Sequence, residues 1–321
     1  MGNGPSRLVP VDASPAQYTQ AFFVLSSAFI VSIQFLPDDI RGVLMDYGAR
    51  RPQQKDAASA TAAANANASP AMLKLRGVLA KLTNCSQVPH SWFRHFYIVS
   101  TGWSVFWLAQ FLSKGRVMAA IASWQQKTAP NGMGLGQTYV VAALMAVQGM
   151  RRLYESYFVA RMGKSPMWFV HWMLGLAYYT AMGLGVWVEG SDAIIDGWKA
   201  GNHKLNVPSF VPFAAALFMA ASAKQNECHA HLSSLKKYTL PEQGLFKHFL
   251  CPHYTCECLL YVALAMAAAP PGTTFNKTVL SGLLFVTVNL GATAYGTKQW
   301  YIEKFGAEQV GNRWMMIPFL W

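Results

Sequence analysis

The 321-residue sequence has few charged residues: they make up 12% of it, against 53% hydrophobic residues. This charged fraction is about half that of a typical soluble domain. Several apolar stretches approach the roughly 20 residues that a helix needs to cross a bilayer. The composition therefore excludes an ordinary soluble domain and predicts an all-α integral membrane protein with several spans.

Acidic residues are scarcer than basic ones, 14 against 26, which gives a formal net charge of +12. Such an excess can indicate nucleic-acid binding. Here, however, Lys and Arg gather in alternate loops, as membrane orientation and anionic lipid headgroups produce. We expect a membrane protein with no nucleic-acid partner.

Cysteines are few and odd in number, and three of the five crowd into one predicted helix, which excludes a disulfide framework. With nearby histidines they could suggest zinc. However, a Cys-x-Cys pair on a helix points its thiols to different faces, and paired C-x2-C knuckles are absent. We expect buried thiols and no metal site. The cysteines are Cys85, Cys228, Cys251, Cys256 and Cys258.

Several familiar motifs are also absent. Residues 1–18 lack the apolar core of a cleavable signal peptide, so the first span is expected to direct insertion. The glycines of 132–136 follow no predicted strand, which excludes a Rossmann fingerprint, and no P-loop, nucleophile elbow or H-E-x-x-H occurs. Tyrosines, histidines and carboxylates beside basic residues remain. These types suit an anionic cofactor and proton donation to a carbonyl-conjugated carbon.

Seven apolar stretches predict membrane spans: residues 20–36, 94–112, 134–152, 166–188, 208–223, 249–269 and 277–295. Basic residues follow the first, third and fifth spans, whereas the loop after the fourth carries Glu189, Asp192 and Asp196. The positive-inside rule then puts the N-terminus in the lumen and the C-terminus in the cytosol. Residues 1–19 form a lumenal segment, 20–295 the membrane domain with a variable low-complexity loop at 53–86, and 296–321 a cytosolic segment.

Residues 224–257 interrupt this apolar pattern. Glu257 lies inside the sixth predicted span, and an ionisable residue at membrane depth is a functional hypothesis by default. Lys236 and Lys237, followed by Tyr238, could receive a phosphate-bearing ligand. The predicted topology brings further polar residues to the same cytosolic side: His95, Tyr97, Glu155 and His229. Together these residues predict one site.

Simpler interpretations stay open for several of these residues. Glu155 follows Arg151 and Arg152, so a helix-end ion pair is the alternative to a catalytic role. Tyr97 is alternatively an interfacial anchor, and Tyr178 and Tyr179 are expected to be belt residues.

The motifs V-P-H-S-W-F-R-H-F-Y-I (88–98), R-R-L-Y-E (151–155), Q-N-E-C-H-A-H-L (225–232), H-Y-T-C-E (253–257), Q-W-Y-I-E-K-F (299–305) and I-P-F-L-W (317–321) resemble the steroid 5α-reductase family. The nearest branch is its polyprenol reductase type. Order and approximate spacing hold from about residue 47 to the C-terminus, and residues 53–86 depart from the pattern.

The resemblance implies a seven-transmembrane-helix bundle in the endoplasmic reticulum membrane that holds NADPH in a cytosol-facing cavity. It implies reduction of the α-isoprene double bond of a long-chain polyprenol or polyprenal, in dolichol synthesis for protein N-glycosylation, and no obligate protein partner. Physical chemistry favours the aldehyde, because an enal delocalises the incoming charge onto an oxygen that a donor can meet.

Carried over by position, the family's cofactor contacts fall on Gln225, His229, Lys236, Lys237, Tyr238, His253, Glu257 and Tyr301. The steroid-reducing members grip the substrate carbonyl with a Glu and a Tyr. This chain has H-F-Y (95–97) at the Glu position and Leu153 near the Tyr position, which argues against a steroid substrate. The expected catalytic group is therefore Tyr97 as the oxygen-polarising donor, supported by His95 or Tyr154, with Glu155.

Three alternative functions are considered. A 3-oxo-steroid 4-dehydrogenase or other enone reductase would use the same chemistry. An isoprenylcysteine methyltransferase would use S-adenosylmethionine, and the basic pair at 236–237 with Tyr238 favours a phosphorylated dinucleotide instead. A non-catalytic lipid-binding or transport protein would predict internal repeats or paired broken helices, which the sequence lacks.

Overall fold

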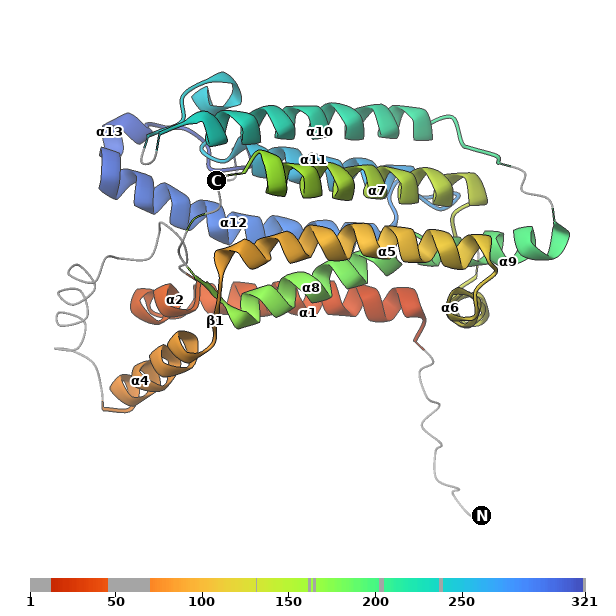
Figure 1. The fold of residues 1–321 in the computed structure, drawn as a ribbon, viewed down its shortest axis with the longest axis horizontal. Coiled ribbons are helices and arrows are strands. Elements are labelled where there is room, and N and C mark those ends of the chain that lie inside the picture. The colour runs from red at the N-terminus through yellow and green to blue at the C-terminus, as the bar shows by residue number, and fades with distance from the viewer. Residues whose placement is uncertain are drawn as a thin grey trace, which may run out of the picture.

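The computed structural model describes residues 13–45, 70–130, 132–160, 163, 166–201, 205–236 and 239–319. Within these residues the chain is helical almost throughout. Long helices run along the longest axis of the molecule, and shorter ones gather at its two ends (Figure 1).

Each stretch predicted as a span overlaps a long helix. These helices are α1 (Pro15–Gln34), α5 (Arg94–Leu112), α7 (Leu135–Phe158), α8 (Phe169–Gly185), α10 (Val211–Ser234), α11 (Pro252–Ala267) and α12 (Lys277–Phe305). In the described part of the chain, α1 and α12 are long and apolar enough to cross a membrane by length and composition. The bounds of α5 agree with the prediction, whereas α7, α10 and α12 continue past the apolar stretches into polar sequence.

Local sequence explains where several of these helices begin. Ser14 caps α1, with its hydroxyl accepting from Gln17 N while the Gln17 side chain accepts from Ser14 N, which forms a capping box. Asn276 caps α12 by accepting from Val279 N at 2.9 Å. Proline occupies the first turn of α1, α10 and α11, where the missing N–H costs no hydrogen bond.

The shorter elements were not predicted from the sequence. They are helices α2 (Asp38–Met45), α4 (Pro70–Cys85), α6 (Arg116–Thr128), α9 (Ser191–Ala200) and α13 (Ala307–Val310), and 3₁₀ helices η2 (His90–Phe93), η3 (Val188–Gly190) and η4 (Gly244–Lys247). Helix α4 lies where the variable loop 53–86 was expected, so its part of that segment is regular structure. Residues 53–69 lie outside the described residues.

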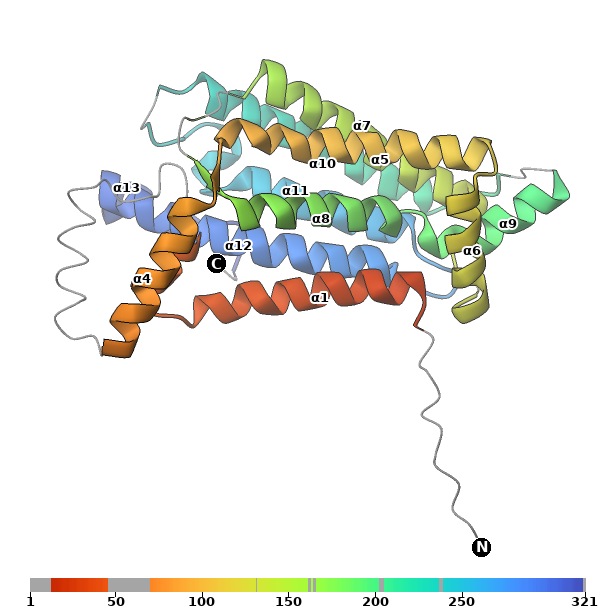
Figure 2. The same cartoon turned by 60° about the horizontal axis from the view of Figure 1, so that its bottom comes forward.

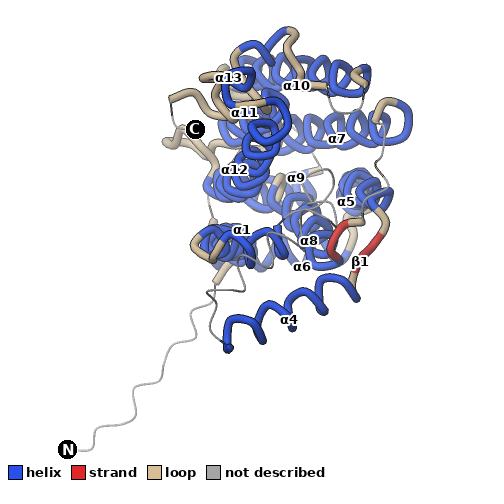
Figure 3. The backbone as a smooth tube through the Cα atoms, turned by 90° about the vertical axis from the view of Figure 1, so that its left-hand side faces the viewer, coloured by secondary structure: helices blue, strands red, loops and turns tan. Residues whose placement is uncertain are grey.

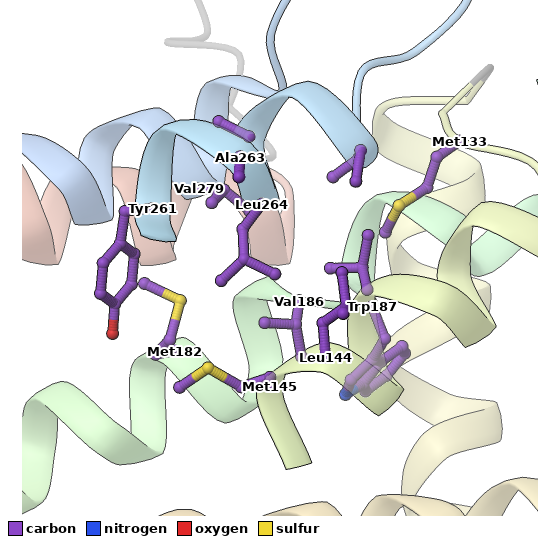
Figure 4. Packing of buried hydrophobic residues seen from close by; sticks show 14 of the residues in the cluster. Met133, Leu144, Met145, Met182, Val186, Trp187, Tyr261, Ala263, Leu264 and Val279 are labelled. Carbon is purple, nitrogen blue, oxygen red and sulfur yellow. The ribbon is translucent and has the colours of Figure 1, made fainter. Parts of the chain in front are cut away.

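The long helices close a ring in which each packs against the next, in the order α1, α8, α5, α7, α10, α11, α12 and back to α1. The tilted view (Figure 2) and the view along the bundle (Figure 3) show this arrangement. The main apolar core fills the ring, and Figure 4 shows Met182 of α8 close to Tyr261 and Leu264 of α11. A smaller cluster joins the end of α12 to the C-terminal segment.

A short antiparallel ladder ties the beginnings of α5 and α8 together. Strands β1 (Gln87–Val88) and β2 (Met167–Trp168) pair Gln87 with Trp168 and Val88 with Met167. Beyond it, Gly175 lets α8 approach α5 closely, because a Cβ at this position would lie 2.5 Å from Phe96 Cε1. The two helices therefore converge at one end of the ring, where the largest polar cluster lies.

Candidate functional site

A cavity of about 390 Å³ lies inside this end of the ring. Its polar and charged wall comes mainly from α7, α10 and α11: Arg152, Gln225, His229, His253 and Glu257. Its aromatic and apolar wall comes mainly from α5, α8 and α12: Phe93, Phe96, Leu174, Tyr178, Tyr179, Phe285, Val286 and Leu290. Such a cavity suits a ligand that has an apolar body and a polar end.

Arg152 is the centre of the polar wall. Its guanidinium donates to the Glu155 carboxylate and to Tyr97 Oη, and it lies over the Tyr97 ring at 4.8 Å from the centroid. His229 Nδ1 lies 2.6 Å from Arg152 Nη1 and 2.8 Å from Glu155 Oε2. A planar guanidinium with five donors can hold three partners at once. Helices α5, α7 and α10 meet through this one side chain.

Glu155 and His229 lie beyond the predicted spans 134–152 and 208–223. Burial raises the pKa of Glu155, but the hydrogen bond with His229 and the charges of Arg152 and Arg151 outweigh it and lower the pKa to about 2. Burial and the charge of Arg152 lower the pKa of His229 to about 4. At neutral pH the site therefore holds a carboxylate beside two guanidinium groups and an uncharged imidazole.

A buried ladder of polar side chains joins α7 to α10 beside this cluster. Gln148 Nε2 donates to Gln225 Oε1 at 2.9 Å, and Gln148 Oε1 accepts from Ser222 Oγ at 3.1 Å and from Arg151 Nη2 at 3.0 Å. Gln225 Nε2 then donates to the Glu257 carboxylate and to the carbonyl of His253 at 3.2 Å. The ladder fixes the Gln225 amide and, through it, the Glu257 carboxylate at the cavity wall.

The structure brings together six of the residues that the sequence singled out: Tyr97, Glu155, Gln225, His229, His253 and Glu257. Tyr97 is 5% exposed and lines the cavity, so its side chain is buried and does not lie at the surface as an interfacial anchor would. Glu155 forms the helix-end ion pairs that were the simpler alternative, and its contact with His229 also joins it to the site.

Two expected catalytic residues lie apart from this cluster. His95 packs against Trp92 and Trp172, and Tyr154 is 60% exposed and contacts Phe158 with its ring tilted. The helical period explains both positions. His95 is two residues from Tyr97 and Tyr154 is two from Arg152, and residues two apart on a helix face different directions.

The remaining expected cofactor contacts lie away from the cavity or outside the described residues. Tyr301 packs in the smaller apolar cluster with Leu250 and Met315. Lys236 is exposed just past the end of α10. Lys237 and Tyr238 lie outside the described residues.

Sequence reasoning missed two cavity residues on α8. Tyr178 and Tyr179 were expected in a membrane-interface belt, yet both line the cavity. A signal was present, because His171, Leu174 and Tyr178 recur at spacings of three and four and so share one helix face. That face also turns toward the cavity.

A family model and several curated proteins match this chain. Residues 164–321 match the family model described as 3-oxo-5-alpha-steroid 4-dehydrogenase. Polyprenal reductase 1 of Arabidopsis thaliana is 28% identical over 251 residues, which cover 68% of this chain and 77% of that protein. The polyprenal reductases of Homo sapiens and Xenopus laevis are 27% and 26% identical, over 73% of this chain and 78% and 77% of their own lengths.

Proposed function

We propose that the chain belongs to the steroid 5α-reductase family and is an NADPH-dependent reductase of polyprenal. It saturates the double bond next to the aldehyde, as a step in the dolichol synthesis that serves protein N-glycosylation. The names and coverage of the relatives support this substrate class.

The observation that carries the proposal is the meeting of a polar cluster and an aromatic cavity at Tyr97. The Tyr97 hydroxyl accepts from Arg152, so its own proton is free to be donated to an aldehyde oxygen. The positive charge of Arg152 stabilises the negative charge that develops on the phenol oxygen as its proton is drawn away. The apolar wall suits the prenoid chain.

The residues of the cavity fit a nicotinamide cofactor. His253 Nδ1 is buried without a hydrogen-bond partner among the residues that the structure describes, which is costly unless a ligand supplies one. Gln225, His229 and His253 would hold the polar groups of the cofactor, and Lys236, Lys237 and Tyr238 its phosphate and ribose. When bound there, the cofactor would supply a hydride to the carbon β to the aldehyde, and Tyr97 would hold the aldehyde oxygen.

The apolar stretches of the long helices are proposed to be seven membrane spans in the endoplasmic reticulum, with the cavity open toward the cytosol. The end that carries the cavity also carries Arg94, Arg151, Arg152, Lys236 and the three cations of α4. The other end carries fewer cations, Lys114, Arg116, Lys127, Lys199 and Lys277, together with Glu189, Asp192 and Asp196. The positive-inside rule supports this orientation.

The test uses purified protein in detergent with NADPH and, separately, polyprenal, polyprenol and a 3-oxo-4-ene steroid. Oxidation of NADPH with polyprenal, together with recovery of the saturated aldehyde, is expected. Oxidation with the steroid alone would replace the proposal with the activity that the family model describes. Failure to bind NADPH would contradict the cofactor assignment.

A further inference from the structure

Helix α4 carries an apolar strip that faces away from the protein. Leu75, Val78 and Leu82 are spaced by three and four residues, so they lie one above another, and they are 48, 54 and 57% exposed. Lys74 and Lys81 are seven residues apart and line up along one side of this strip. The helix contains Lys74, Arg76 and Lys81 but no acidic residue.

The position of α4 differs from that of the long helices. It packs mainly on α2. It runs across the direction of the long helices, outside their ring, at the end that carries the cavity (Figures 1 and 3). With 16 residues and three cations it is too short and too charged to span a bilayer.

We propose that α4 lies flat on the cytosolic leaflet and binds an anionic lipid surface. The strip of Leu75, Val78 and Leu82 enters the boundary between headgroups and acyl chains, as in other interfacial amphipathic helices. Lys74 and Lys81 then meet the headgroups of a leaflet whose surface is negative. The lysines beside the strip favour this occupant over a second copy of the chain, which is itself basic.

Binding of α4 to the leaflet would also position one wall of the cavity. Only four residues separate Cys85, the end of α4, from η2, and η2 leads directly into α5. Phe93 of η2 and Phe96 and Tyr97 of α5 line the cavity, and β1 in between pairs with Met167, another lining residue. A membrane-bound α4 therefore holds this side of the cavity at the depth of the lipid headgroups. The inference uses the proposed topology but not the proposed reductase activity.

The test measures the depth of α4 in the full-length protein in lipid nanodiscs. Nitroxide labels are placed singly by Val78→Cys, Leu82→Cys or Gly77→Cys, in a background in which exposed Cys85 is replaced by Ser. Gly77 is the matched control, because a Cβ there meets nothing within 4 Å and the position lies beyond the lysines, off the apolar strip. The Cys85→Ser protein without an added cysteine corrects for labelling elsewhere.

In bilayers that contain phosphatidylserine, labels at 78 and 82 are expected to collide with dissolved oxygen and to be shielded from an aqueous nickel chelate. The label at 77 should show the reverse. Lys74→Gln with Lys81→Gln should lower the ratio of docked to undocked helix roughly 30-fold in these bilayers and have little effect in uncharged ones. Circular dichroism and the melting temperature of each variant show that it is folded.

Equal exposure of positions 77, 78 and 82 to the chelate in anionic bilayers would overturn the proposal. Shielding of 78 and 82 that persists in lipid-free detergent and rises with protein concentration would also overturn it, in favour of contact between copies. Shielding that is independent of both lysines would remove the anionic lipid as the partner.

Discussion

Arg152 shows how one residue can organise a site. It contacts Tyr97 on α5, Glu155 on its own helix and His229 on α10. A lysine at this position would offer a single ammonium group and could not reach three partners in one plane. The planar fork therefore explains why an arginine, rather than any cation, connects the proposed donor to its carboxylate.

Tyr97→Phe should lower kcat with polyprenal by roughly 10²- to 10³-fold, the usual cost of losing a hydrogen-bond donor to a developing oxyanion. The phenyl ring keeps its edge contacts with Phe93 and Tyr179, so KM and NADPH affinity should change little. Steady-state kinetics and a cofactor titration measure the two effects. Tyr154→Phe is the control, because its exposed side chain lies outside the cluster. Loss of activity in Tyr154→Phe but not in Tyr97→Phe would reverse the assignment.

Glu155→Gln should destabilise the protein by about 3 kcal/mol, because it leaves two largely buried guanidinium groups without a counter-charge. The melting temperature in detergent is the measurement. Glu227→Gln is the matched control: its pair with Lys224 is more than half exposed, so little change is expected. Equal melting temperatures for both variants would show that the buried pairs contribute nothing.

The ion pairs of Glu155 with Arg151 and Arg152 also predict that the stability of the protein depends on pH. The pKa of Glu155 is lowered from its ordinary 4.5 to about 2 in the folded protein, so the carboxylate contributes full stability above pH 4.5. That contribution is lost as pH falls toward 2. The melting temperatures of the wild type and of Glu155→Gln should therefore converge below pH 4.5. A constant difference down to pH 2 would show that Glu155 does not titrate in this way.

At the scale of elements, the ladder between α7 and α10 places the Gln225 amide. Gln148→Leu removes one hydrogen bond from each of Gln225, Ser222 and Arg151, and should cost about 1–3 kcal/mol of stability. Activity should fall as well, because Gln225 Oε1 keeps only Arg151 as a donor and the amide is held less firmly beside Glu257. Val147→Leu, on a more exposed face of α7, is the control. A fully active Gln148→Leu protein would show that Gln225 is held without the ladder.

The elements also show what sequence could and could not predict. The length of the apolar stretches in the sequence located all the long helices of the described residues, because a buried or lipid-facing helix must be apolar over its middle turns. It ended α7 and α10 too early, at residues 152 and 223, because hydropathy stops at the first polar residues. The backbone continues, since Arg151, Glu155 and Gln225 find partners across the ring. Short, mixed-polarity helices such as α4, α6 and α9 gave no such signal.

The residues of the candidate site were likewise predicted only in part from the sequence. Motif resemblance identified Tyr97, Gln225, His229, His253 and Glu257, which the fold brings together. It could not tell which neighbours in a motif share a face, so His95 and Tyr154 were included and Arg152 was not. Tyr178 and Tyr179 were assigned to the membrane interface because composition says nothing about which side of a helix faces inward.

At the scale of the whole molecule, the cavity end of the bundle carries more Lys and Arg residues than the opposite end, and this difference supports the proposed orientation. Lys236 follows α10 at the end that carries the cavity, whereas Lys199 is exposed on α9 at the opposite end (Figure 1). In sealed endoplasmic-reticulum vesicles that expose their cytosolic face, a membrane-impermeant maleimide should label Lys236→Cys at once. Lys199→Cys should react only after the vesicles are permeabilised.

Both variants carry Cys85→Ser, since Cys85 is exposed at the cavity end and would react itself. Because both lysines are exposed, the substitutions leave the packing of the ring unchanged. Labelling of both positions before permeabilisation would mean that the ring does not separate two compartments. Labelling of Lys199→Cys alone before permeabilisation would mean that the protein has the inverted orientation. The cavity would then face the lumen, away from the cytosolic pool of cofactor that the proposed reaction needs.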